Sequence, residues 1–184
     1  AVPLAKQRTM AAAAASPVTR PRVLFSSDVH GNDAQYAKIF AAAIERRVHA
    51  VLLGGDLSPK CQYMRERDYY TRMQREQREW IGGTFAAALT PLRDAGIAVF
   101  AIVGNGDVSA NYDALLELES RGLLTMVDGR RVALATFRDA GGASHRFELV
   151  GLPHVPFSWS SMKDFEVHDT AVATADDAAL ITCL

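Results

Sequence analysis

The sequence has 184 residues, 49% of them hydrophobic and 22% charged, and its 20 basic and 21 acidic residues give a formal net charge of -1. This composition is typical of one soluble globular domain and excludes a disordered, fibrous or polyanion-coating protein. The longest apolar run, residues 97–103, is far shorter than the roughly 20 residues that span a bilayer. Two cysteines cannot form a disulfide-dense scaffold, so Cys61 and Cys183 are expected to be free thiols in a reducing compartment.

The first 22 residues differ in composition from the rest. They are rich in alanine and contain four basic and no acidic residues, as organellar targeting segments do. We expect a disordered leader, with a targeting segment as the alternative. We therefore expect the folded domain over residues 23–184 and a cytoplasmic location, with a mitochondrial location as the alternative.

Short apolar runs and helical patterns then alternate. Residues 23–27 predict a buried strand, and Asn32 or Asp33 can cap a helix that ends near residue 47. Further strands are expected over residues 48–53 and 97–103. A helix over residues 111–121 is expected to direct Leu115, Leu116 and Leu118 inward and to stop at Gly122.

A long helical insert separates the second and third of these strands. It covers about residues 61–94 and is expected to break at the two glycines before residue 84. Acidic and basic residues are interleaved in its first part, which predicts a solvent-exposed helix. A rim that attracts phosphate is the alternative.

After residue 121 the pattern becomes antiparallel. Residues 124–127 and 131–137 predict a hairpin with a turn at Asp128 and Gly129, and another strand is expected over 145–151. Residues 153–169 indicate a loop, and residues 178–182 a last strand. The fold class is therefore α/β, with alternating helices and strands followed by a meander.

Polar side chains follow three successive strands. Asp28 and His30 come after the first strand, Asp56 after the second, and Asn105 and Asp107 after the third. Ligands gather where parallel strands end, and carboxylate, imidazole and amide donors suit Mn, Fe, Mg or Zn. Asp56 could bridge two ions about 3.5–4 Å apart, and Asn105 could bind the second. The sequence thus predicts a metal site.

The segments that contain these residues are Ser-Asp-Val-His-Gly-Asn at 27–32, Gly-Gly-Asp at 54–56 and Gly-Asn-Gly-Asp at 104–107. They resemble, in order and spacing, the first three motifs of the calcineurin-like metallophosphoesterases. The resemblance implies an αββα sandwich and a dinuclear metal-dependent phosphoesterase, a phosphatase or phosphodiesterase that attacks its phosphate-ester substrate with a metal-bridging hydroxide.

The same resemblance assigns roles to individual residues. Asp28, His30, Asp56 and Asn105 would hold two divalent ions, with manganese among the candidates, and Asp107 and Asn105 are the candidate catalytic residues. Asp107 matches the family aspartate that orients a histidine next to the asparagine. The implied partner is a phosphate ester, with no membrane and no specific nucleic acid.

Two departures from the family pattern stand out. Gly106 occupies the position of the histidine that is thought to protonate the leaving oxygen, a role typically worth about 10²–10⁴ in rate. The later histidine motifs have no counterpart, so we expect that the sequence stops before them. His154 and His168 are candidates to replace a missing metal ligand.

Two alternatives to a hydrolase remain at this point. One is a non-catalytic scaffold of the same fold for protein–protein interaction, which Gly106 and the missing ligands favour. The other is a signalling domain with carboxylates around one Mg²⁺, against which His30 and Asn105 argue.

Overall fold

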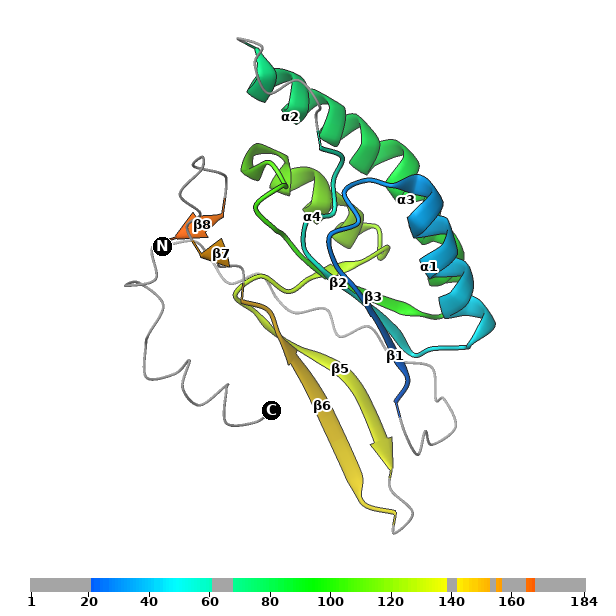
Figure 1. The fold of residues 1–184 in the computed structure, drawn as a ribbon. Helices are drawn as coiled ribbons and strands as arrows, with labels where there is room; N and C mark the ends of the chain where they lie inside the picture. The colour runs from blue at the N-terminus through cyan, green and yellow to red at the C-terminus, as the bar shows by residue number, and fades with distance from the viewer. Residues whose placement is uncertain (1–20, 61–67, 139–141, 153–154, 157–164, 168–184) are drawn as a thin grey trace.

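The structure is a computed structural model that describes residues 21–60, 68–138, 142–152, 155–156 and 165–167 (Figure 1). Several predictions fall outside these residues and are not tested by it. They concern the leader, Cys61 and Cys183, His154 and His168, and the strand expected over residues 178–182.

A four-stranded parallel sheet forms the centre of the fold (Figure 1). Its strands lie in chain order and are β1 (Val23–Ser26), β2 (Ala50–Gly54), β3 (Ala98–Ile102) and β4 (Thr125–Met126). β1, β2 and β3 pair in register, so that all three end at the same edge of the sheet. The alternation predicted from the sequence is confirmed. The prediction that the first strand is buried is wrong, because β1 lies at the edge of the sheet and its Val23 and Phe25 are 39% and 67% exposed.

Helices cover one face of this sheet. They are α1 (Asp33–Glu45), α2 (Tyr69–Trp80), α3 (Ala86–Asp94) and α4 (Tyr112–Ser120), the last preceded by a 3₁₀ turn (Ser109–Asn111). Asn32 caps α1 as predicted, because its side-chain oxygen accepts the Gln35 N–H at 3.1 Å. Apolar residues of α1, α3 and α4 form one buried core with Val51, Leu53, Val99 and Ala101 of the sheet.

The helical insert does not break where the glycines predict. A π-helical segment (Ile81–Phe85) joins α2 to α3 without interruption. Ile81 and Phe85 on either side of the glycines are completely buried, and the Phe85 ring stacks on Trp80 with 4.7 Å between ring centroids. This burial outweighs the cost of about 1 kcal/mol that glycine brings to a helix.

One residue of α4 faces the opposite way from the prediction. Leu115 and Leu118 are buried, but Leu116 is 41% exposed. Successive residues of a helix lie about 100° apart, so Leu116 cannot share the inward face with both. Gly122 ends this region as predicted, with a φ of 68° that suits the left-handed C-terminal cap.

The hairpin predicted around Asp128 and Gly129 is wrong. β4 pairs in parallel with β3, and β5 (Arg131–Arg138) instead pairs in antiparallel with β6 (Ser144–Val150). The Asp128 carboxylate accepts the Val103 N–H at 3.0 Å, which fixes the turn beside β3. Two short strands, β7 (Val155–Pro156) and β8 (Glu166–Val167), lie where a loop was expected.

The hairpin of β5 and β6 lies on the face of the sheet opposite the helices (Figure 1). There Phe100 and Val127 are buried against Val132, Leu134 and Leu149. The fold is thus the α/β arrangement that the sequence predicted. Among the described residues, no helix is long and apolar enough to span a membrane.

Candidate metal centre

The loops after β1 and β2 are joined by backbone hydrogen bonds that continue beyond the strands. The N–H groups of Asp28, His30 and Gly31 donate to the carbonyl groups of Gly55, Asp56 and Leu57 at 3.2, 2.8 and 2.8 Å, respectively. The two loops therefore run side by side at the edge of the sheet where the strands end, although they are far apart in sequence. In parallel sheets, this is the edge where ligands bind.

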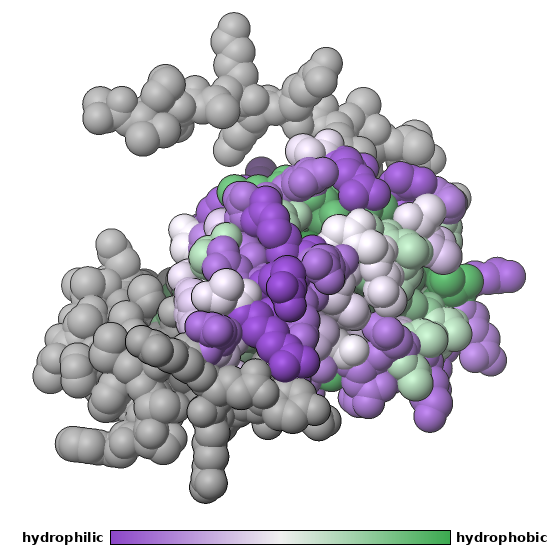
Figure 2. Space-filling view, turned by 90° about the horizontal axis from the view of Figure 1, so that it is seen from above, coloured by the Kyte–Doolittle hydropathy of each residue, from purple (hydrophilic) through white to green (hydrophobic). Residues whose placement is uncertain are grey.

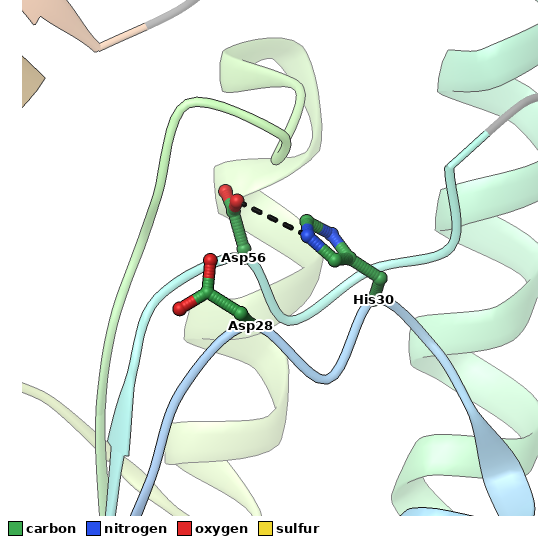
Figure 3. A group of neighbouring side chains, drawn as sticks. All are labelled: Asp28, His30 and Asp56. Atoms are coloured by element: carbon green, nitrogen blue, oxygen red, sulfur yellow. Dashed lines mark ion pairs between the residues drawn. The ribbon is translucent and has the colours of Figure 1, made fainter.

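Three predicted ligands converge in these loops. Asp28, His30 and Asp56 each offer one ligand atom, and these atoms lie within 4.8 Å of one another. The His30 ring and the Asp56 carboxylate face each other, with 3.3 Å between Nε2 and Oδ2, and the Asp28 carboxylate lies beside Asp56 (Figure 3). The two carboxyl groups are therefore close enough to contact one ion.

All three residues have a left-handed backbone, which is uncommon for residues other than glycine. Their φ angles are 56°, 51° and 52° for Asp28, His30 and Asp56. Such conformations cost about 1–3 kcal/mol each and cluster at functional sites, where the rest of the fold imposes them. Aspartate and histidine tolerate this region better than most side chains. Here it turns three side chains toward one space.

The three residues fit a divalent metal ion. The His30 nitrogen that faces the Asp56 carboxylate is Nε2, so this is the ring atom that an ion between the side chains would contact. Two carboxylates and an imidazole are a donor set that Mn²⁺, Fe²⁺ and Zn²⁺ accept. The face of the molecule in Figure 2 is largely hydrophilic, and Asp28 is exposed, so an ion can reach the three residues.

The loop after β3 packs directly against Asp56. The Gly106 N–H donates to Asp56 Oδ1 at 2.6 Å, and a Cβ on Gly104 would overlap the backbone nitrogen and Oδ1 of Asp56. Asn105 lies between these two glycines, so its loop reaches the site. That its side chain binds a second ion stays a prediction.

Asp107 does not belong to the converging group. It is 3% exposed, and its carboxylate accepts the N–H groups of Leu57, Ser58 and Gly104 at 3.2, 2.8 and 2.9 Å. Burial raises the pKa of the Asp107 carboxyl above its ordinary value, while these backbone donors act in the opposite direction. Its oxygens thus tie the loop after β3 to the loop after β2, and its catalytic role stays a prediction.

Replacing Asp107 by asparagine is expected to destabilise the protein by about 1–3 kcal/mol, because the amide would present N–H to at least one buried N–H donor. The free energy of unfolding in urea measures this. Asp94→Asn is the control, since Asp94 is exposed and bonds its neighbour Arg93. Equal stability of the two variants would contradict the role of Asp107.

Two residues that the sequence analysis missed also hold the loop after β2. The Tyr36 hydroxyl donates to the Leu57 carbonyl at 3.0 Å, and Gln77 of α2 donates to the Pro59 carbonyl at 3.1 Å. Gln77 lies three residues before Trp80, on the side of α2 that faces the core. That spacing was visible in the sequence, but a lone glutamine in a charged helix gives no sign of its partners.

The sequence of residues 21–170 matches the family model of the calcineurin-like phosphoesterases. The match covers most of the chain. The chain therefore belongs to the calcineurin-like phosphoesterase family, as its three motifs predicted.

Two solved structures share the fold. One is TT1561 of Thermus thermophilus, with 15% sequence identity and a TM-score of 0.53; it is matched over 89% of this chain and 64% of its own. A second structure has the same identity and TM-score, over 90% of this chain and 65% of its own. The chain thus spans about two-thirds of the length of each. No curated protein matches the sequence.

Proposed function

We propose that this protein is a metal-dependent phosphoesterase that hydrolyses phosphomonoesters or phosphodiesters with two divalent ions. The observation that carries the proposal is the convergence of Asp28, His30 and Asp56 in three left-handed backbone positions. Membership of the calcineurin-like phosphoesterase family supports the same chemistry. Asn105 is the proposed ligand that brings the second ion, and manganese the proposed metal.

Bound divalent ions would supply Lewis acidity to the phosphate ester and acidify water to near neutral pKa. The residues of this chain perform the positioning. The Gly106 N–H holds Oδ1 of Asp56, which fixes the carboxylate with Oδ2 toward His30. The backbone bonds between the first two loops keep Asp28 and Asp56 side by side.

The absence of a side chain at Gly106 also affects which phosphate esters the site can hydrolyse. It stands at the position of the family histidine, and a Cβ there would lie 3.0 Å from Asp56 Oδ1 and 3.4 Å from His30 Cε1. A side chain at this position would therefore press on both ligands. Without it, the leaving oxygen has no imidazole proton donor at residue 106, so we propose a preference for esters with good leaving groups.

The test is hydrolysis of bis(p-nitrophenyl) phosphate and of p-nitrophenyl phosphate by the purified protein. We expect Mn²⁺-dependent release of nitrophenol that EDTA abolishes and excess Mn²⁺ restores. Asp28→Asn should lower the rate at least about 100-fold, because an amide oxygen is a weaker ligand than a carboxylate and asparagine keeps the left-handed backbone.

Failure to bind Mn²⁺ in calorimetry would refute the metal site itself. Binding of Mn²⁺ without turnover of either ester would instead favour the non-catalytic scaffold, for which the absence of a side chain at Gly106 is the supporting observation. The two measurements therefore separate the hydrolase from the scaffold.

A further inference from the structure

Gln77 is a fully buried amide in a helix that is otherwise mostly polar and solvent-facing. Its exposed fraction is 0%, and it lies within α2, one turn before the buried Trp80. A buried primary amide is costly unless its hydrogen-bonding groups are satisfied. Among the described residues, Gln77 forms three hydrogen bonds, and their partners are backbone atoms outside its own helix.

These bonds connect two of the three loops that form the metal centre. The Gln77 amide nitrogen donates to the carbonyl groups of Pro59 at 3.1 Å and Gly106 at 2.8 Å, and its oxygen accepts the Val108 N–H at 2.9 Å. Carbonyl groups can only accept and an N–H can only donate, so the partners themselves fix the orientation of the amide. One side chain thereby joins the loop after β2 to the loop after β3.

The connection extends to a metal ligand. Gly106 accepts the Gln77 amide with its carbonyl and donates its own N–H to Asp56 Oδ1 at 2.6 Å. Glycine has little conformational preference of its own, so external bonds decide how Gly106 is oriented. Gln77 supplies such a bond to the Gly106 carbonyl.

We propose that Gln77 is a positioning residue of the metal centre, which holds the Gly106 backbone so that its N–H fixes the Asp56 carboxylate for metal binding. The proposal rests on the metal site of the proposed function and adds to it a residue from the helical insert. Groups that orient ligands in this indirect way typically change metal affinity about 10–100-fold when they are replaced.

A purely structural role would give a different result, and a second buried amide provides the control. Asn111 is 2% exposed and donates to the Gln74 carbonyl at 2.9 Å, one turn before Gln77 in the same helix. It thus secures the same helix through a bond to Gln74 rather than to Pro59 or Gly106. Replacing it should weaken the packing of α2 without disturbing Asp56.

The experiment compares Gln77→Met, Gln77→Glu and Asn111→Ala. Methionine keeps the length and loses all three hydrogen bonds, whereas glutamate keeps an acceptor for Val108 and sets a carboxylate against the Pro59 and Gly106 carbonyls. Calorimetry with Mn²⁺, at a temperature where each protein is folded, should give about 10–100-fold weaker binding for both Gln77 variants. Asn111→Ala should bind within about threefold of wild type at a lower Tm.

Amide hydrogen exchange of Gly106 in the metal-free protein is the second readout. We expect slow exchange in the wild type and in Asn111→Ala, and clearly faster exchange in both Gln77 variants. Wild-type Mn²⁺ affinity together with unchanged Gly106 exchange in the Gln77 variants would overturn the proposal. If the wild type itself binds no Mn²⁺, the proposed metal site fails, and Gly106 exchange still decides whether Gln77 positions this backbone.

Discussion

Asp56→Asn is expected to abolish the function of the metal centre while leaving the fold intact. The substitution removes the negative charge from the carboxylate that faces His30. The asparagine side-chain oxygen can still accept the Gly106 N–H, and asparagine tolerates the φ of 52° at this position. We therefore expect at least about 100-fold weaker Mn²⁺ binding and a similar or larger loss of ester hydrolysis, with the metal-free Tm nearly unchanged.

Asp113→Asn is the matched control for this change. Asp113 is exposed and forms a bidentate ion pair with Arg78, so its loss should leave the Tm nearly unchanged and Mn²⁺ binding as in wild type. Calorimetry and thermal unfolding of the two variants give the comparison. If the Asp56→Asn variant binds Mn²⁺ as tightly as the Asp113→Asn variant does, Asp56 is not a metal ligand.

Gly104→Ala is expected to have the second largest effect, although alanine adds only a methyl group. That methyl would overlap the backbone nitrogen and Oδ1 of Asp56. Asp56 cannot easily retreat, because its carbonyl accepts the His30 N–H and its carboxylate the Gly106 N–H. We expect a loss of about 1–3 kcal/mol in the free energy of unfolding together with strongly weakened Mn²⁺ binding.

A second glycine shows whether this effect is steric. Gly82 lies in the π-helical segment with no atom within 4 Å of where its Cβ would be. Gly82→Ala should therefore stabilise the protein by up to about 1 kcal/mol, because alanine favours helices more than glycine does. Urea unfolding of both variants measures the contrast. Equal stability of Gly104→Ala and wild type would show that the loop after β3 does not press on Asp56.

Local patterns predicted the helices and strands well where residues close in sequence decide them. The apolar runs that became β1, β2 and β3, the Asn32 cap and the stop at Gly122 depend on residues close in sequence. The predictions failed where distant contacts decide. β4 pairs with β3 and not with β5. The helix continues through two glycines that were expected to end it, because Ile81 and Phe85 on either side of them are buried in the core.

Some features of the site could likewise be predicted from the sequence, and others could not. Asp28, His30 and Asp56 follow neighbouring strands of a parallel sheet, whose ends lie at one edge. The sequence by itself therefore determined the family and predicted where these three side chains lie. Only the tertiary structure decided what holds them. The structure gives the three residues their left-handed backbone. The Asp107 carboxylate and the Gln77 amide hold the loops through hydrogen bonds to backbone groups, which nearly every residue type carries. Backbone partners leave no mark in a sequence, because the hydrogen bond is specified by where the chain passes and not by which side chain it bears.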